Sequence, residues 1–254
     1  MTAIGDRMKS NYEDRARLML TRRMPVITRV DGRAFHTFTR GFERPFDKRI
    51  IMAMEKAARS VCEDAQGCKA AYIQSDEASF LFTDYDTITT EAWFDYNKAK
   101  VETITASIMT AAFNVAIESS RSAHFDARAF NVPREDVANY FLWRMMDWER
   151  NSVSMYCGAH FSHKQMHGKG KADQHEMLHS IGRNWATDLS PAERNGRWLI
   201  RGESGFDTTC DITPSWLEVN DLIGFAVNCD TQQEQPWPTS KPFTTTSASP
   251  LYPA

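Results

Sequence analysis

The sequence predicts an α+β fold in which an antiparallel sheet is covered by helices on one face. Two observations indicate it: the expected elements follow the order strand, helix, strand, strand, helix, strand, and a short turn joins the two middle strands. Strands joined by a short turn pair antiparallel, and the helices between strands pack against the resulting sheet. With 254 residues, 42% of them hydrophobic, the chain is long enough for one sizeable domain with elaborations.

The chain begins with an expected helix and an expected strand. The segment "NYEDRARLMLTRR" (11–23) has a helical pattern. "MPVITRVDG" follows it, with Pro25 before a β-branched run and Asp31-Gly32 at its end. A β-branched run bounded by turn residues is typical of a strand that enters a tight turn. We therefore expect the first strand to end at Asp31.

A helix and a hairpin come next. The apolar residues of 45–67 recur at helical spacing, and Gly67 marks the end of the pattern. "CKAAYIQ" (68–74) and "ASFLFTD" (78–84) are apolar runs of strand type, separated by Ser75-Asp76-Glu77. Two such runs around a short polar turn predict a β-hairpin with two acids at its tip.

The remaining elements are less regular toward the C-terminus. We expect a helix over about 101–119, a strand at "HFDARAFNVP" (124–133) and a helix over 134–152. After Asn151, a basic, His-rich stretch is followed by a segment that is rich in Pro, Ser and Thr from Gln232 onward. That composition predicts an extended or mobile tail.

Composition and charge exclude several classes of protein. The net charge is −3, so any nucleic-acid surface must be local. The five cysteines are odd in number and form no C-x-x-C pair, which suits reduced thiols better than a disulfide framework. The first residues lack the apolar core of a signal peptide, and no run approaches the roughly 20 apolar residues of a membrane span. We expect a soluble, cytoplasmic protein.

The acids at the two turns predict a metal site. If the first strand pairs with a strand of the hairpin, Asp31 and Asp76 lie close together at one sheet edge. Two hard carboxylates are a typical Mg²⁺ site that is completed by substrate phosphates, and two ions can serve the attacking and leaving oxygens. The turn "GRAFH" could wrap a triphosphate with its N–H groups, and Arg29, Arg33 and Arg44 add suitable charge. The alternative is a solvated hairpin with acids in its turn, since Asp is common in turns.

Several stretches, in order, resemble the tRNA-His guanylyltransferase superfamily. "PVITRVDGRAFHTFTRGFERPFD" is followed by "YIQSDEASFLF", and "KVETITASIMTAAFN" resembles the family's K-x(5)-AS helix. "HFDARAFNVP" resembles its F-D-[GA]-R strand, and "YFLWRMMDWERNS" is similar to its W-R-Q-x-D-x-x-R-N-S helix. The resemblance covers about residues 12–201. Several motifs in the right order are far more specific than any one of them.

The resemblance implies a polymerase-palm-like sheet that works in the 3′-to-5′ direction. It implies a nucleotidyltransferase that adds GTP-derived nucleotides to the 5′ end of a tRNA, with two Mg²⁺ ions, GTP and ATP as cofactors. A 5′-monophosphate is first activated with ATP or GTP, and the 3′-OH of an incoming GTP then attacks it. Under this resemblance, residues 1–135 form the catalytic domain, 136–231 belong to the same unit as a helical and irregular extension, and 232–254 are the tail. The family also implies a homotetramer, a dimer of dimers.

The motifs carry over specific site residues. Asp31, Asp76 and the carbonyl of Gly32 would hold the metal ions, with Glu77 as the third catalytic acid. The residues expected to bind nucleotide are Asp31, Gly32, Arg33, Ala34, Phe35, His36, Arg44, Asp47, Ser75, Asp76 and Lys100. The residues expected to bind RNA are Arg128, Arg150, Asn151, Lys169 and Lys171. On the residues alone, a role for His36 as a hydrogen-bonding turn residue is as well supported as a role as a catalytic base.

The chain departs from the family pattern at a few positions. The eukaryotic H-I-N-N is replaced by "ERNS" (149–152), which favours the Thg1-like branch and its template-directed repair of truncated tRNAs. Met145 replaces the Gln of W-R-Q. Asn97 and Gln174 stand where an Arg and a Lys are expected, which weakens the match at the activating-triphosphate pocket.

Other residues favour ordinary explanations. Cys157 and the histidines of 160–179 are dense, but their spacing fits no standard zinc pairing. A basic loop that faces RNA phosphate, or a solvated loop, explains them better. Trp143 and Trp148 share one expected helix, and we expect both in the core because aromatic bulk usually packs there.

Two rival functions remain open at this stage. A palm-type nucleotide cyclase or oligonucleotide synthase would use the same acids, but it would leave the motifs after Phe125 unexplained. A catalytically silent RNA-binding protein could keep the fold, but the intact Asp31, Asp76 and Glu77 argue against it.

Overall fold

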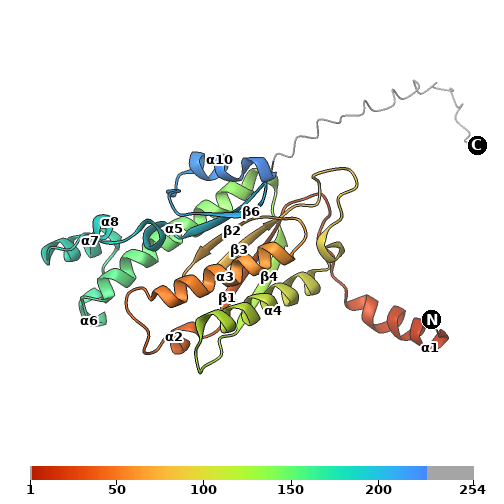
Figure 1. The fold of residues 1–254 in the computed structure, drawn as a ribbon, viewed down its shortest axis with the longest axis horizontal. Helices are drawn as coiled ribbons and strands as arrows, with labels where there is room; N and C mark the ends of the chain where they lie inside the picture. The colour runs from red at the N-terminus through yellow and green to blue at the C-terminus, as the bar shows by residue number, and fades with distance from the viewer. Residues whose placement is uncertain (1, 228–254) are drawn as a thin grey trace, which may run out of the picture.

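The centre of the structure is an antiparallel sheet. This computed structural model describes residues 2–227, so the expected tail (232–254) lies outside the described residues. The sheet has six strands in the order β4-β1-β3-β2-β5-β6 (Figure 1). The strands are β1 (Val26–Gly32), β2 (Cys68–Gln74), β3 (Glu77–Phe82), β4 (Phe125–Asn131), β5 (Arg197–Gly202) and β6 (Gly205–Thr209). The predicted α+β class with an antiparallel sheet is confirmed.

Long helices cover both faces of the sheet. Helices α3 (Lys48–Asp64) and α4 (Lys98–Ile117) lie side by side on one face (Figure 1). Helices α5 (Arg134–Gly158) and α10 (Trp216–Val227) pack on the other. Strand alternation explains the two cores: Val26 and Val30 of β1 point into the first, and Ile27 points into the second. The expectation of helices on one face holds for α3 and α4, and the C-terminal extension adds a second helical layer.

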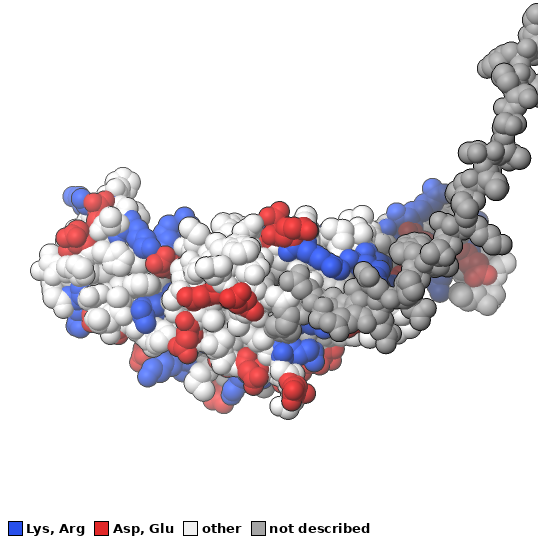
Figure 2. Space-filling view, turned by 90° about the horizontal axis from the view of Figure 1, so that it is seen from above, with Lys and Arg blue, Asp and Glu red and all other residues white. Residues whose placement is uncertain are grey.

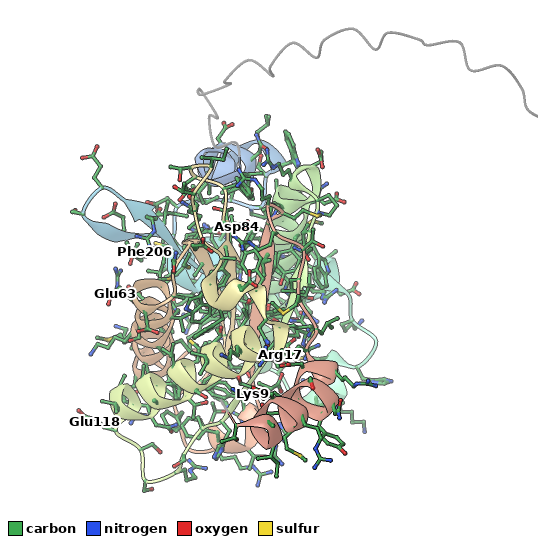
Figure 3. The ribbon with its side chains drawn as sticks, turned by 90° about the vertical axis from the view of Figure 1, so that its right-hand side faces the viewer. Lys9, Arg17, Glu63, Asp84, Glu118 and Phe206 are labelled. Carbon is green, nitrogen blue, oxygen red and sulfur yellow. The ribbon has the colours of Figure 1, made fainter. Side chains whose placement is uncertain are left out.

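Shorter helices complete the described chain. They are α1 (Ala3–Met8), the π-helix η1 (Lys9–Glu13), the 3₁₀ helices η2 (Asp14–Ala16) and η3 (Trp93–Tyr96), α2 (Phe35–Phe38), α6 (His163–Met166), α7 (Lys171–Ser180), α8 (Trp185–Asp188) and α9 (Pro191–Asn195). The stretch expected as a basic loop after Asn151 is therefore partly helical. The N-terminal arm formed by α1 and η1 extends away from the sheet and buries no residue, and Lys9 and Arg17 lie along it in Figure 3.

The expected first helix (11–23) is wrong beyond Ala16. The helical turns end there, and Arg17 is extended. The reason is a competing pairing with a distant segment. The Leu20 N–H donates to the Tyr96 carbonyl at 2.9 Å, and the Lys98 N–H donates to the Leu18 carbonyl at 2.9 Å. The backbone groups that a helix would have used internally are therefore satisfied by residues 96–98, at the end of η3 and the start of α4.

The other expected elements agree with the structure to within a few residues, except that α5 runs on to Gly158. The hairpin is tighter than expected, because Glu77 pairs with Gln74 and leaves only Ser75 and Asp76 in the turn. The C-terminal strands extend the same sheet: β5 pairs with β2, and β6 pairs with β5. Arg59 of α3 donates to the carbonyl of Phe206, which lies beside α3 in Figure 3.

Helix α3 begins at a strongly bonded carboxylate. Asp47 is the N-cap, and its oxygens accept from the N–H groups of Arg49 and Glu43, each at 2.9 Å. The Arg49 guanidinium also donates to both oxygens. The Arg49 hydrogen bonds, aided by the backbone N–H groups and opposed by burial, lower the pKa of Asp47 to about 2. Asp47 therefore fixes both the start of α3 and the loop before it.

We expect Asp47→Ala to lower the free energy of unfolding by about 1–2 kcal/mol near neutral pH, because a bonded N-cap is lost. The folded pKa of about 2 lies below the unfolded value of about 3.9. The ionised carboxylate therefore contributes fully above roughly pH 4, and its contribution is lost as the pH falls toward 2. Urea unfolding at about pH 7 and about pH 3 should show the difference from wild type shrinking. Asp64→Ala, at the exposed other end of α3, is the control. A difference that stays constant with pH would contradict the assignment.

Candidate functional site

Two turns place two carboxylates at one edge of the sheet. Strands β1 and β3 pair antiparallel with Asp31 opposite Glu77, as expected from the sequence. The Gly32 N–H donates to the Asp76 carbonyl at 3.1 Å. A Cβ on Gly32 would lie 2.9 Å from Asp76 Oδ2 and 2.5 Å from the ring of Phe35, so only glycine fits between them. Asp31, Gly32 and Asp76 thus form one compact group.

The charge of this group is uncompensated. Burial raises the pKa of Asp76, and the neighbouring Asp31 raises it further, against a hydrogen bond from Ser75. Among residues 2–227, neither carboxylate forms an ion pair with Lys, Arg or His. Two adjacent carboxylates without a cationic partner are a donor set that suits a hard divalent ion such as Mg²⁺. The residues present therefore fit the expected metal.

Glu77 has a different environment from the two aspartates. Arg144 of α5 donates to it through Nε at 2.7 Å and through a terminal nitrogen at 2.9 Å, and the Gln74 amide donates to it at 3.2 Å. Burial raises the pKa of Glu77, while Arg144 and Arg29 oppose that shift. Arg144 also contacts Asp147 at 3.0 Å. Glu77 therefore ties the acidic edge to α5.

A pocket of about 640 Å³ opens at the acidic edge. This volume lies in the range of ordinary small-molecule sites. Of the predicted site residues, the pocket is lined by Asp31, Gly32, Ala34, Phe35, His36, Arg44, Asp47, Ser75 and Asp76. Ala34, with φ 49°, is left-handed and directly precedes the short helix α2, so the chain turns sharply between Gly32 and Phe35. The structure thus brings the two predicted acidic turns and the predicted phosphate turn to one cavity.

Other predicted nucleotide contacts lie elsewhere. The Arg33 side chain is exposed, and its N–H donates to His124. Lys100 lies in the first turn of α4, with its amine 5.6 Å from the centre of the Phe94 ring. Helix α4 runs antiparallel to β4, so its first turn lies near the end of β4, where Glu102 accepts from the N–H of Ala129. The end of β4 pairs with the start of β1, and Asp31 lies at the opposite end of β1. Lys100 therefore does not line the pocket of its own chain.

The positions that depart from the family pattern also lie outside this pocket. Asn97 caps α4 by accepting from the Lys100 N–H at 3.2 Å. Gln174 is buried on α7, where it donates to the Lys169 carbonyl. Neither residue lines the pocket.

The predicted RNA-binding residues lie on three parts of the structure: β4, α5 and the start of α7. Arg128 lies on β4 beside Asp126, and Arg150 and Asn151 lie on α5, where both contact Asp147. Lys171 pairs with Glu149 at 2.7 Å, and Lys169 precedes α7. Figure 2 shows the face seen from above, where acidic and basic side chains are interspersed.

One of the two tryptophans expected in the core is exposed. Trp148 is buried against Phe46, as expected. The prediction that Trp143 packs in the core is wrong: this residue is 52% exposed and lies beside Tyr140 and Arg144. Trp143 lies on α5, one helical turn from Asp147, so it borders the same surface as Arg150 and Asn151.

Several pocket residues were missed from the sequence. They are Gln74, Ile50, Ile51, Met155, Glu193 and Arg197. Gln74 is the one polar residue that ends an apolar strand, and Arg197 is a charge directly before the apolar "WLI". A polar residue at a strand end beside a predicted site was the available signal for both.

Two absences are findings for the described part of the chain. Within residues 2–227, no group of three or more His, Cys, Asp or Glu side chains could hold a metal ion, the histidines of 160–179 included. No helix in the same residues is long and apolar enough to cross a membrane.

Comparisons with known proteins identify the family. The model of the tRNAHis guanylyltransferase family matches residues 5–133. A tRNA(His) guanylyltransferase of Schizosaccharomyces pombe is 28% identical over 194 residues, covering 68% of this chain and 72% of the relative. A probable tRNA(His) guanylyltransferase of Homo sapiens is 30% identical over 230 residues, covering 82% and 70%.

Solved structures give the same answer. A bacterial tRNA(His) guanylyltransferase-like protein in complex with ATP has a TM-score of 0.83 and 38% identity, covering 88% of this chain and 99% of that one. A bacterial tRNA(His) guanylyltransferase-like protein in complex with GTP has a TM-score of 0.77 and 34% identity, covering 89% of this chain and 99% of that one. The Saccharomyces cerevisiae enzyme, at 20% identity and a TM-score of 0.67 over 81% and 96%, shares the fold. This chain therefore belongs to the tRNAHis guanylyltransferase family.

Proposed function

We propose that this protein is a Mg²⁺-dependent 3′-to-5′ nucleotidyltransferase that adds GTP-derived nucleotides to the 5′ end of a tRNA. It would act as a tRNA(His) guanylyltransferase or as a 5′-end repair enzyme. The observation that carries the proposal is the uncompensated pair Asp31 and Asp76 at the mouth of a nucleotide-sized pocket. Similarity to a bacterial relative in complex with ATP and with GTP supports both nucleotides as ligands.

The residues of the site have distinct roles in this proposal. Asp31, Asp76 and the Gly32 carbonyl would hold two Mg²⁺ ions. Bound there, Mg²⁺ would activate the attacking hydroxyl and stabilise the leaving oxygen. Gly32 allows the close approach of Asp76. The N–H groups of Gly32 and Arg33 are already bonded, so those of Ala34, Phe35 and His36 would be the ones that meet the triphosphate. Arg44 adds positive charge at the pocket, and Ser75 hydrogen-bonds Asp76 and holds its carboxylate in place.

The RNA 5′ end would approach along the surface between β4 and α5. The side chains of Arg128 and Arg150 are 52% and 67% exposed there and can meet phosphate. The exposed ring of Trp143 offers a surface on which a base can stack. Asn151 and the lysines Lys169 and Lys171 extend this surface toward α7.

The organisation of the protein is also part of the proposal. Residues 1–135 and 136–231 would act as one catalytic unit, since β5 of the second part pairs with β2 of the first. A homotetramer would cover the N-terminal arm, where Ile4 and Tyr12 are 63% and 67% exposed. A cytoplasmic location remains a prediction.

The test of this function is nucleotide addition. Labelled GTP, ATP and Mg²⁺ would be supplied with full-length tRNA-His and with a tRNA that lacks its first nucleotide, each as the 5′-monophosphate and the 5′-triphosphate. Label at the 5′ end that disappears with EDTA would establish the activity. GTP consumed without labelled RNA would instead favour a cyclase, and bound RNA without turnover would favour a silent RNA-binding protein.

We expect Asp31→Asn and Asp76→Asn each to lower the rate of nucleotide addition about a thousandfold or more, because a lost metal carboxylate costs several kcal/mol of barrier. Each variant also removes one of two like charges, so its melting temperature without Mg²⁺ should equal or exceed that of wild type. Asp64→Asn, at the exposed far end of α3, is the control for a lost surface carboxylate. A variant that loses both activity and stability would argue for a structural role.

We expect Glu77→Gln to act chiefly on stability. The buried Arg144 would lose its bidentate partner, at a cost of about 2–4 kcal/mol in the free energy of unfolding. Urea unfolding measures this, with the exposed Glu135→Gln as control. Full stability with activity lost as completely as in Asp76→Asn would instead make Glu77 a direct participant.

We expect Arg128→Gln and Arg150→Gln to weaken RNA binding without changing GTP affinity. Each should reduce the slope of log affinity against log salt by about 1, because one phosphate contact is lost. Fluorescence anisotropy of labelled tRNA at several KCl concentrations measures the slope. Lys56→Gln, on α3 across the sheet, should leave it unchanged. Equal slopes for all variants would contradict the proposed RNA surface.

A further inference from the structure

Three buried polar atoms, each on a residue that lines the pocket, have no hydrogen-bond partner among the described residues. They are Oε1 of Gln74, Nε1 of Trp148 and Nε of Arg197. Their residues are only 5%, 4% and 6% exposed. A buried polar atom left unpaired costs about 1–3 kcal/mol, so such atoms in a cavity wall indicate a ligand that pairs with them.

Gln74 offers an acceptor. Its amide nitrogen donates to Oε1 of Glu77 at 3.2 Å. A carboxylate can only accept, so this contact assigns the nitrogen to Glu77 and leaves the amide oxygen unpaired. Gln74 lies on the same face of β2 as Tyr72, which packs toward α5.

Arg197 offers donors from the opposite face of the sheet. It pairs with Ile73 across β5 and β2 and shares the face of Leu199, which packs toward α3. No hydrogen bond from its guanidinium reaches the described residues, and the nearest carboxylate oxygen, on Glu55, is 3.5 Å from Nε. Burial lowers the pKa of Arg197, against the charge of Glu55. Nε thus faces Glu55, and the terminal guanidinium nitrogens are the donors that remain available at the strand ends.

The surroundings favour a flat base over a phosphate. Phe46, Ile50, Ile51, Trp148 and Met155 form apolar walls of the same pocket. The charge of Arg197 is largely matched by Glu55, which lies at its back. A triphosphate would gain little there and belongs at the metal edge of Asp31 and Asp76. An aromatic base gains apolar contact and satisfies the unpaired atoms with its edges.

We propose that this inner wall selects guanine over adenine. Arg197 donates to O6 and N7 of the base, and Oε1 of Gln74 accepts from its N1–H and N2–H groups. The planar fork of arginine matches the two acceptors of guanine, whereas adenine presents the donor N6–H₂ at the O6 position. The inference rests on the proposed function for the orientation of the nucleotide, with its triphosphate at the acidic edge.

The test is nucleotide binding by the full chain with Mg²⁺ and without RNA. Calorimetry would give the dissociation constants of GTP, ATP and 7-deaza-GTP, which lacks only the N7 acceptor. We expect GTP to bind about 5- to 140-fold more tightly than ATP, the range that one bidentate contact supplies. We also expect 7-deaza-GTP to bind more weakly than GTP.

The decisive variant is Arg197→Lys. Lysine keeps a cation beside Glu55, so we expect the variant to fold. It lacks the planar pair of N–H donors with which arginine contacts two acceptors. In this variant, the ratio of the ATP to the GTP dissociation constant and the ratio of the 7-deaza-GTP to the GTP dissociation constant should both fall toward one. Gln74→Met removes the acceptor on the other side and should lower the preference for GTP over ITP, which lacks N2. Arg194→Gln, in the same segment but outside the pocket, is the control and should keep all ratios.

The outcomes separate this inference from the proposed function. If the ratios of dissociation constants are unchanged in Arg197→Lys, or if GTP and ATP lose affinity equally, the base assignment is overturned, even if the wild-type protein extends RNA. Collapsed ratios in a protein that extends no RNA would support the base assignment and overturn the nucleotidyltransferase. Absence of binding by either nucleotide would overturn both.

Discussion

The register between β1 and β3 is the constraint on which the site depends. With Asp31 opposite Glu77, the two-residue turn must fold back over Gly32, and this puts Asp76 beside Asp31. Register in a sheet is strongly specified where both faces are buried, because a slip by one residue would turn every side chain to the wrong core. Phe80 and Leu81 lie in separate cores here, so the apolar packing of β3 holds the acids together at the edge. The repulsion between them is then a cost that the core imposes and that the proposed divalent ion would relieve.

A second contact connects this edge to the helix that walls the pocket. Glu77 and Asp147 share Arg144, so β3 and α5 are joined directly behind the acids. Buried ion pairs add little net stability, but they fix geometry where one partner cannot move without exposing the other. Trp148 follows Asp147 on the same helix and forms part of the pocket wall. The position of the wall and that of the carboxylates therefore depend on the same arginine.

Local signals made most of the N-terminal half predictable from the sequence. β-branched runs, helical periodicity and Gly67 located the strands and helices between Val26 and Asn131, and the two acidic turns indicated the acidic edge of the sheet. The N-terminal helix was overestimated because the pairing of Leu18 and Leu20 with residues 96–98 is nonlocal. The exposure of Trp143 and the pocket positions of Gln74 and Arg197 depend on which face of an element meets which neighbour. Periodicity cannot give that information once both faces of the sheet are covered.

The pocket is built from segments that are far apart in the chain. Asp31 and Asp76 come from the first third, Trp148 from the middle, and Arg197 from a strand that joins the sheet late in the sequence. During synthesis, the acidic edge can form as soon as β3 has paired with β1. The opposite wall must wait until β5 has left the ribosome and has docked on β2, a long-range and therefore slow step. A nascent chain would thus hold its acids in place before it has a cavity in which to use them, and only the finished protein would bind a nucleotide.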